Sequence, residues 1–350
     1  MGTGVIERPA EFRAVSEFLL SAGRQPSALV IEGEAGIGKT TLWLGAAAQA
    51  RDRGFRVFSA RGGQAETVLA YAAVADLLGD VEPAVLAELP EVQRIAVDRV
   101  LLRASSEGPS TDHGVVAAAL AGVIDRLSAD TPVLIAIDDV QWLDPSSQAV
   151  VAFAARRFLG RVGLLLTERT EHEGTTAASW LQLGVPDGIA RVRVSPLSLG
   201  GLHALISTRL GRSFPRPTMV RIAEISGGNP FYALELARAI EAESSSSRQV
   251  LPATLAELMR LRIGRLDRDT QVLLLGAACA AEPTVNLLAR VTDTTVERAV
   301  ELLAEAQAKG IIAIDDGVVR FTHPLLARSV YTDASPAQRR AMHRSLANTV

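Results

Sequence analysis

The stretch Gly33-Glu34-Ala35-Gly36-Ile37-Gly38-Lys39-Thr40 carries the complete pattern G-x-x-x-x-G-K-[ST]. This pattern is typical of a loop whose backbone N–H groups surround phosphates, while the lysine reaches the β- and γ-phosphates and the hydroxyl reaches Mg²⁺. Lys39 is one of only two lysines in the chain. Its compact ammonium on a flexible stem fits between phosphates where a planar guanidinium would not. The alternative is a glycine-rich turn with an incidental lysine.

The sequence on either side of this loop predicts the strand and the helix that the pattern requires. Residues 28–32 form a short apolar run, and residues 41–50 read as a helix. The backbone from Gly33 to Thr41, together with the positive end of the helix dipole, would then bind phosphate groups. Thr40 supplies a hydroxyl for Mg²⁺. We therefore predict a nucleotide site at this turn.

Composition narrows the class of protein. A chain of 350 residues suggests two or three domains, and a net charge of -3 gives no general attraction to nucleic acid or to an anionic membrane. Cys279 is the single cysteine, so an internal disulfide is excluded and no zinc site is expected. The N-terminus lacks the apolar run of a signal peptide, and no uncharged apolar run is long enough to span a membrane. We expect a cytoplasmic protein without a membrane partner.

The first half of the chain predicts an α/β fold with a parallel sheet and helices on both faces. Helical patterns lie between apolar, β-branched segments that read as strands. One strand separates the phosphate loop from the later strand that ends in Asp138, and this insertion indicates the branch of P-loop ATPases with an added central strand. The predicted strands are residues 28–32, 56–60, 133–138, 162–168 and 191–194, and the clearest helices are residues 71–78, 115–127 and 147–158.

The second half predicts a different architecture. Residues 201–210, 218–226 and 230–242 read as helices of a small lid, followed by a flexible linker at residues 243–248. Further helices follow, including residues 295–309, and then two short apolar runs flank Asp316-Gly317, which is a strong hairpin signal. Helices followed by a hairpin are typical of a winged helix. The expected domains are an ATPase core at residues 1–195, a lid at 196–243, and a winged helix with the start of a further helical region at 244–350.

An apolar strand at residues 133–138 ends in two neighbouring acids, Asp138 and Asp139. Behind a phosphate loop, the first acid would hold Mg²⁺ through its water shell. The second, Asp139, is then a candidate base that orients the attacking water. The alternative is that both acids only cap the helix that follows.

Residues 137–144, taken with the phosphate loop, resemble the ATPase module of large LuxR-type transcriptional regulators. These regulators are signal-transduction ATPases with numerous domains, which are related to the AAA+ proteins. The resemblance covers essentially the whole chain and implies an adenine nucleotide, ATP or ADP, with Mg²⁺. It also implies that effector sensing and DNA binding belong to regions absent from this chain, and it leaves nucleotide-dependent self-association open.

The same resemblance assigns roles to residues outside the two strong motifs. Residues 6–12 resemble an opening box that lies against the adenine, and Arg8 is the position that carries over, although Glu7 stands where the family commonly has glycine. Residues 164–169 resemble a strand with a sensor arginine, so Arg169 would contact the γ-phosphate. Read without the resemblance, Arg169 is an ordinary solvated arginine at a strand end.

Two further positions carry over from the second half of the chain. Gly227-Gly228-Asn229-Pro230-Phe231 resembles a lid motif whose proline, Pro230, packs near the base; the alternative is a plain turn at a helix start. Residues 321–326 resemble a winged-helix segment in which His323 contacts the β-phosphate of ADP. The alternative for His323 is a structural histidine after a hairpin.

Two functions follow from these motifs. The first is a regulatory switch that binds ATP, hydrolyses it slowly, and opens or closes the lid and winged helix. The second is an active AAA+-like motor that remodels a macromolecular partner. A motor would need a glutamate base and a clear arginine finger, and this chain offers Asp139 and only the weak candidate pair at residues 156–157. Basic and acidic residues are nearly equal in number after residue 250, so direct DNA binding by the winged helix is not expected.

Overall fold

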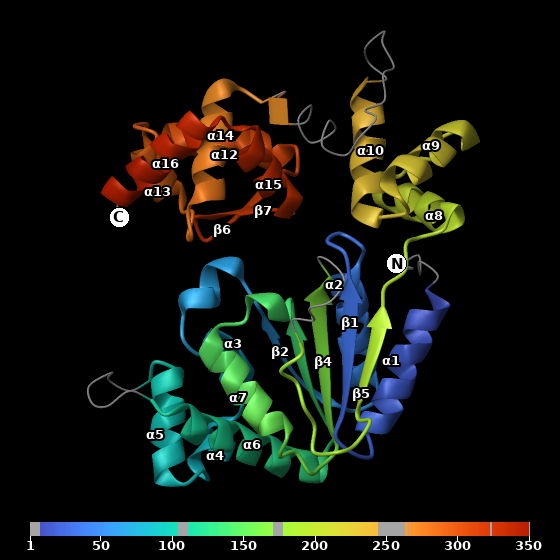
Figure 1. Ribbon diagram of the computed structural model, residues 1–350, viewed down its shortest axis with the longest axis vertical. Coiled ribbons are helices and arrows are strands. Elements are labelled where there is room, and N and C mark those ends of the chain that lie inside the picture. Colours follow the sequence, from blue (N-terminus) through green and yellow to red (C-terminus); the bar gives the residue numbers. More distant parts are fainter. Residues whose placement is uncertain are drawn as a thin grey trace. The chain divides into compact units, whose positions relative to one another are not determined.

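The computed structural model describes residues 8–103, 111–170, 178–243, 263–264, 266–322 and 324–349. Figure 1 shows its helices and strands in the order of the chain. The chain divides into two compact units, Glu7–Ser195 and a second unit that contains Pro196–Val350. Each unit has its own buried apolar core, so each is described by itself.

A five-stranded sheet organises the unit Glu7–Ser195, and all of its strand pairs are parallel. The predicted α/β fold with a parallel sheet is therefore confirmed. The strands lie in the order β2-β3-β4-β1-β5. Their bounds are β1 Ser27–Gly33, β2 Arg56–Arg61, β3 Val133–Asp138, β4 Val162–Arg169 and β5 Ile189–Arg193.

The strand order refines one expectation from the sequence. The strand that follows the phosphate loop in the chain, β2, lies at an edge of the sheet and pairs only with β3 among the described strands. The strand inserted between β1 and β3 is β4, which comes later in the chain. The sheet thus has the added central strand, and that strand is the one that ends in Arg169. The order depends on contacts between distant segments, so the succession of strands along the sequence does not reveal it.

The sheet is covered on both faces because successive residues of each strand point to opposite sides. In β1, Val30 belongs to one apolar core while its neighbours Leu29 and Ile31 belong to the other. In β3, Ile135 and Leu134 divide in the same way. One core contains side chains of α1 (Pro9–Ala22) and α2 (Lys39–Asp52). The other contains side chains of α3 (Ala72–Gly79), α4 (Pro83–Ala87), α5 (Glu91–Val100), α6 (His113–Asp130) and α7 (Pro145–Ala155). Helices on both faces agree with the prediction.

The unit Pro196–Val350 is built from helices and one hairpin. Its described helices are α8 Leu199–Leu210, α9 Arg216–Ser226, α10 Pro230–Glu243, α12 Arg268–Cys279, α13 Val285–Val291, α14 Val296–Ala308, α15 Pro324–Asp333 and α16 Pro336–Thr349. The hairpin joins β6 (Ile312–Asp315) to the antiparallel β7 (Val318–Phe321). Asp316 and Gly317 connect them with φ angles of 47° and 77°, the left-handed pair that a two-residue type I′ turn requires. The predicted hairpin is present.

Among the described residues, no helix combines the length and the apolar character needed to cross a membrane.

Candidate functional site

The phosphate loop connects the carboxyl end of β1 to the first residue of α2. Gly36 and Gly38 have φ angles of 79° and 104°, a left-handed backbone that glycine adopts without the steric penalty of a side chain. No side chain caps the N-terminus of α2, so the N–H groups of its first turn keep their hydrogen-bonding capacity. The loop therefore offers backbone donors and the positive end of a helix dipole at one place, which suits an anion.

The Lys39 side chain is folded back onto this loop. Its Nζ donates to the carbonyl oxygens of Gly33 and Glu34, each at 3.0 Å. Only 7 % of Lys39 is exposed, and burial lowers the pKa of its amine. Nearby charges act on the same pKa: Asp139 and Asp138 raise it, and Arg169 lowers it. Lys39 is thus close to the predicted acids and to the predicted sensor arginine.

Asp138, at the end of β3, is the buried carboxylate of the site, with 3 % of the residue exposed. Burial raises the pKa of Asp138, and hydrogen bonds from the hydroxyls of Thr167 and Thr40 act in the opposite direction. The Thr167 Oγ1 donates to Asp138 Oδ1 at 2.5 Å. Thr40 and Asp138 are therefore neighbours, as the predicted Mg²⁺ site requires.

The donors at this point fit Mg²⁺. The described residues contain no group of three or more His, Cys, Asp or Glu side chains that could enclose a metal ion. Mg²⁺ in nucleotide sites usually keeps several waters and is held by one or two carboxylates together with substrate phosphates, so a dedicated protein cage is not needed. A buried carboxylate beside a hydroxyl at the mouth of a phosphate loop meets this requirement.

Asp139 occupies a special backbone position directly after β3. Its φ of 56° is left-handed, a conformation that aspartate tolerates better than most residues. Its N–H donates to Thr167 Oγ1 at 2.8 Å, so Thr167 holds both acids. The Asp139 Oδ1 accepts a hydrogen bond from the Gln141 Nε2 at 2.7 Å. The backbone turn and the two hydrogen bonds fix where the Asp139 carboxylate points.

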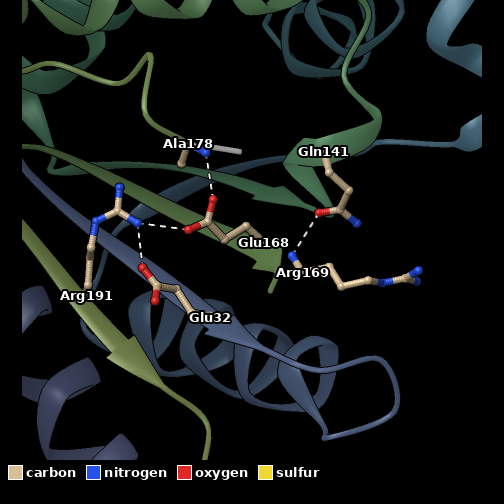
Figure 2. A network of polar contacts seen from close by, with 6 residues as sticks. All are labelled: Glu32, Gln141, Glu168, Arg169, Ala178 and Arg191. Atoms are coloured by element: carbon tan, nitrogen blue, oxygen red, sulfur yellow. Dashed lines mark hydrogen bonds and ion pairs between the residues drawn. The ribbon is translucent and has the colours of Figure 1, made fainter. Parts of the chain in front are cut away.

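Arg169 ends β4, next to the start of the phosphate loop. It is the register partner of Gly33 on β1, and the N–H of Thr170 donates to the Gly33 carbonyl at 3.2 Å. The Arg169 N–H donates to Gln141 Oε1 at 3.1 Å, as Figure 2 shows. The backbone of the predicted sensor is therefore tied both to the loop and to the segment of the second acid.

Arg8 contacts the phosphate loop from outside. Its Nη2 donates to the Ile37 carbonyl at 2.7 Å, and its Nη1 donates to the Ser195 carbonyl at 2.6 Å. Glu11 lies 3.6 Å from the Arg8 Nη1 and accepts a hydrogen bond from the Ser195 N–H at 3.0 Å. Burial lowers the pKa of Arg8 below its ordinary value. Arg8 and Glu11 thus fasten the loop to the segment that follows β5.

A second polar network involves Glu32 and Glu168, which directly precede Gly33 and Arg169 in the sequence. Arg191 on β5 donates from Nη1 to Glu32 Oε1 at 2.5 Å and to Glu168 Oε1 at 2.8 Å. Glu168 is fully buried, and its Oε2 accepts a hydrogen bond from the Ala178 N–H at 2.6 Å. Figure 2 shows Arg191 reaching both carboxylates. One guanidinium therefore joins the ends of three neighbouring strands.

Arg61, at the end of β2, is a further cation near the acids. It is the register partner of Asp138, and its Nε lies 4.0 Å from Asp138 Oδ2. Its guanidinium carbon lies 5.5 Å from the ring centroid of Trp43 on α2. Arg61 is positioned beside the predicted metal carboxylate, and the sequence analysis did not identify it.

The remaining two predicted positions, Pro230 and His323, belong to the second half of the chain. Pro230 is the first residue of α10 in the other unit, and Asn229 Oδ1 caps that helix by accepting from the N–H of Phe231 at 3.1 Å. This local role matches the helix-start alternative for Pro230. His323 lies outside the described residues, so its predicted contact with ADP stays a prediction.

Residues 5–166 match the family described as the AAA ATPase domain. This part of the chain is an AAA-type P-loop ATPase module. The match covers the phosphate loop, both acids and the first part of β4, and it ends before Thr167 and Arg169. The family implies nucleotide binding, usually with Mg²⁺.

Two of the similar proteins are much longer than this chain, which spans less than half of each. An uncharacterized protein of Rhizobium meliloti is 24% identical over 393 residues, which cover 100% of this chain and 37% of that protein. A signal transduction ATPase with numerous domains (STAND) and a tetratricopeptide repeat sensor, from Pyrococcus horikoshii, has a TM-score of 0.57 at 14% identity. That similarity covers 95% of this chain and 44% of the Pyrococcus chain, and at this identity it shows a common fold. A Walker-type ATPase of Pyrococcus abyssi reaches a TM-score of 0.46 at 14% identity, over 93% of this chain and 96% of the other.

Sequence analysis missed the residues that hold the predicted ones in place. Glu11 stands three positions after Arg8, inside the box already recognised, and Thr167 stands two positions before Arg169. Gln141 stands two positions after Asp139. Each position could have been noted as a polar residue close to a motif. Its partner, however, lies 28 to 184 residues away, and only the folded chain reveals it.

Proposed function

We propose that this chain is an ATP-binding, slowly hydrolysing switch module of a LuxR-type transcriptional regulator. The observation that carries the proposal is that the phosphate loop, the two acids after β3 and Arg169 lie at the carboxyl ends of the adjacent parallel strands β1, β3 and β4, and hydrogen bonds of Lys39 and Thr167 tie them together. The resemblance of the sequence to these regulators and the fold shared with a STAND protein support the regulatory role.

Each residue of the site has a part in this proposal. The Lys39 amine exchanges the carbonyls of Gly33 and Glu34 for the β- and γ-phosphates of ATP. Thr40 and Asp138 hold Mg²⁺, which would supply charge neutralisation for the phosphate oxygens. Asp139 orients the attacking water and accepts its proton, and Arg169 stabilises charge on the γ-phosphate.

Slow turnover is part of the proposal for a physical reason. The candidate base is an aspartate, which has a shorter reach than a glutamate, and an arginine finger is worth several powers of ten in rate where one is present. Arg157, in the pair considered for that role, follows the end of α7 and donates to the carbonyl of Phe153 on that helix. A switch needs only that nucleotide changes the balance between two states through different contacts in each.

The second unit completes the proposal. We propose that residues 196–243 act as a lid and that residues 244–350 contain a winged helix, built from α12, α13, α14 and the β6–β7 hairpin, followed by the start of a further helical region. Pro230 and His323 would carry contacts with the base and with ADP. DNA and effector would bind through regions outside this chain.

The test is to identify the nucleotide that co-purifies with the full chain and to measure ATP turnover. We expect ATP or ADP in the purified protein, turnover below about one per second in the wild type, and little residual turnover in Lys39→Ala and Asp139→Asn. Lys309→Ala removes the only other lysine, which pairs with Glu305 on α14, and is the matched control. Turnover of many ATP molecules per second in the wild type would overturn the switch and indicate a motor.

A further inference from the structure

Gln141 links the two groups that would act on the γ-phosphate. Its side-chain amide donates from Nε2 to Asp139 Oδ1 at 2.7 Å and accepts at Oε1 from the Arg169 N–H at 3.1 Å. Only one orientation of the amide satisfies both contacts, because a backbone N–H can only donate and an ionised carboxylate can only accept. Figure 2 shows the Gln141 oxygen directed at the Arg169 backbone.

The Gln141 side chain is not needed to build the turn in which it lies. Gln141 belongs to a short 3₁₀ helix, Val140–Trp142, which the Trp142 N–H closes by donating to the Asp139 carbonyl at 2.9 Å. The backbone therefore completes this turn without the amide. The side chain instead crosses to β4, whose Arg169 is 28 positions along the chain.

Thr167 completes the same arrangement from the other side of Asp139. Its Oγ1 accepts from the Asp139 N–H at 2.8 Å and donates to Asp138 Oδ1 at 2.5 Å. The hydrogen bonds thus run in one direction, from the Arg169 N–H through Gln141 to Asp139, and from the Asp139 N–H through Thr167 to Asp138. The contact with Gln141 uses one acceptor site on Oδ1 of Asp139, so the ionised carboxylate keeps acceptor sites that can take a proton from water.

We infer that Gln141 is a positioning residue for ATP hydrolysis: it aims the Asp139 carboxylate and ties that aim to the end of β4 that carries Arg169. This inference rests on the proposed hydrolytic function and adds a residue to it. Misplacing a catalytic group by a small distance reduces the rate of a positioned reaction strongly, even where binding is unchanged. Gln141 therefore acts on turnover and not on affinity for ATP.

The test compares Gln141→Glu with Gln141→Met in the full chain, at a pH well above the ordinary carboxyl range. Glutamate keeps an acceptor for the Arg169 N–H but has no donor for Asp139, and it places a second negative charge beside that carboxylate. Methionine has a similar length and offers neither contact. We expect kcat for ATP to fall at least about tenfold in both variants, while the Kd for ATP changes by less than about threefold. Thermal unfolding of both variants is measured alongside, so that kcat is compared only between folded proteins.

Two substitutions of Thr167 test the other hydrogen bonds that hold Asp139 and Asp138. Thr167→Ser keeps the hydroxyl and should keep kcat within about threefold of the wild type, whereas the isosteric Thr167→Val should lower it at least about tenfold. If Gln141→Glu retains the wild-type kcat, Gln141 only anchors the backbone of Arg169 and the inference is wrong. A change confined to the Kd for ATP would also overturn it. ATP binding with no turnover in the wild type would instead refute the proposed hydrolysis itself.

Discussion

Two charged side chains of the site, those of Lys39 and Asp138, are buried and so lose the water that stabilises a charged group. Burial lowers the pKa of Lys39 and raises the pKa of Asp138. In both cases the folded chain disfavours the charged form, which is the form that binding phosphate and metal requires. The charges that the proposed binding of phosphate and metal requires therefore lower the free energy of unfolding of the nucleotide-free protein.

Asp138→Asn should raise the free energy of unfolding of the nucleotide-free protein. The same substitution should abolish the effect of Mg²⁺ on ATP binding. A folded-state pKa above the unfolded value means that the ionised carboxylate destabilises the fold at neutral pH, and that this penalty disappears as pH falls through the folded pKa. Asparagine keeps an acceptor for the Thr167 hydroxyl without the charge. We expect an increase of roughly 1 kcal/mol in the free energy of unfolding by urea at neutral pH, shrinking toward pH ~4. A less stable variant at neutral pH would contradict this reasoning.

Arg8→Ala should weaken binding of triphosphates in general and not of adenine in particular. Arg8 contacts the Ile37 and Ser195 carbonyls, so its loss should loosen the phosphate loop. Calorimetric titration should show an affinity reduced about tenfold, and by the same factor, for ATP, GTP and inorganic tripolyphosphate. Arg13→Ala, exposed on the same helix, is the control. A loss confined to ATP would instead support the contact with adenine that the sequence resemblance implies.

The residues of the site differ in how far the sequence predicts them. Lys39 and Asp138 are predicted because each belongs to a short contiguous sequence pattern, and their roles in binding stay predictions. Arg8 was predicted at the adenine from resemblance, and its observed contacts are with the backbone of the loop and of Ser195. Gln141 and Thr167 each join two segments that lie 28 or 29 residues apart in the chain, so no local pattern marks them.

At the level of strands and helices, the close contact between the ends of β2 and β3 is critical for the position of the acids. The Gly62 N–H donates to the Asp138 carbonyl at 2.9 Å. A Cβ on Gly62 would lie 2.6 Å from the carbonyl oxygen of Asp139 and 3.2 Å from Trp142. These neighbours are mostly backbone atoms, so they can move only if the turn that follows β3 moves with them.

Gly62→Ala should therefore displace this turn. We expect a loss of about 1–3 kcal/mol in the free energy of unfolding, the usual range for overpacking, and a lower kcat for ATP. Gly79→Ala is the matched control, because a Cβ there meets no atom within 4 Å. Urea denaturation and steady-state turnover measure the two effects. Equal stability of the two variants would show that the turn can adapt.

Removing the countercharge of Glu32 and Glu168 should destabilise the sheet. Arg191→Met keeps much of the apolar stem but leaves two adjacent carboxylates, one fully buried, without their cation. Breaking a buried pair costs about 3–5 kcal/mol, and we expect about 2 kcal/mol here because Arg191 is partly exposed. Arg193→Met on the same strand is the control in urea unfolding. No difference between the two variants would exclude an important role for this network.

Strand positions were predicted well because buried parallel strands give continuous apolar runs bounded by polar residues. The order of strands was not, since β4 lies between β1 and β3 through contacts that local sequence does not encode. Helix α1 was also not predicted. It contains Glu11, and Arg8 is the residue directly before its first turn. The resemblance assigns residues 6–12 to a nucleotide-binding box and does not indicate a helix.

For the chain as a whole, we propose that the unit Glu7–Ser195 binds a nucleoside triphosphate with Mg²⁺ at the carboxyl ends of β1 and β3. The regulatory role, the effector and the DNA target are proposals that concern more than this chain, which spans 37% of the similar Rhizobium meliloti protein and 44% of the similar Pyrococcus horikoshii chain. Binding can be tested on this chain without any of those partners.

The most direct measurement is a calorimetric titration of ATP, with and without Mg²⁺, into the full chain and into Lys39→Ala and Lys309→Ala. We predict saturable binding that Mg²⁺ strengthens, at least about tenfold weaker binding in Lys39→Ala, and wild-type binding in Lys309→Ala. If the folded wild type binds neither ATP nor GTP in the presence of Mg²⁺, the account is wrong.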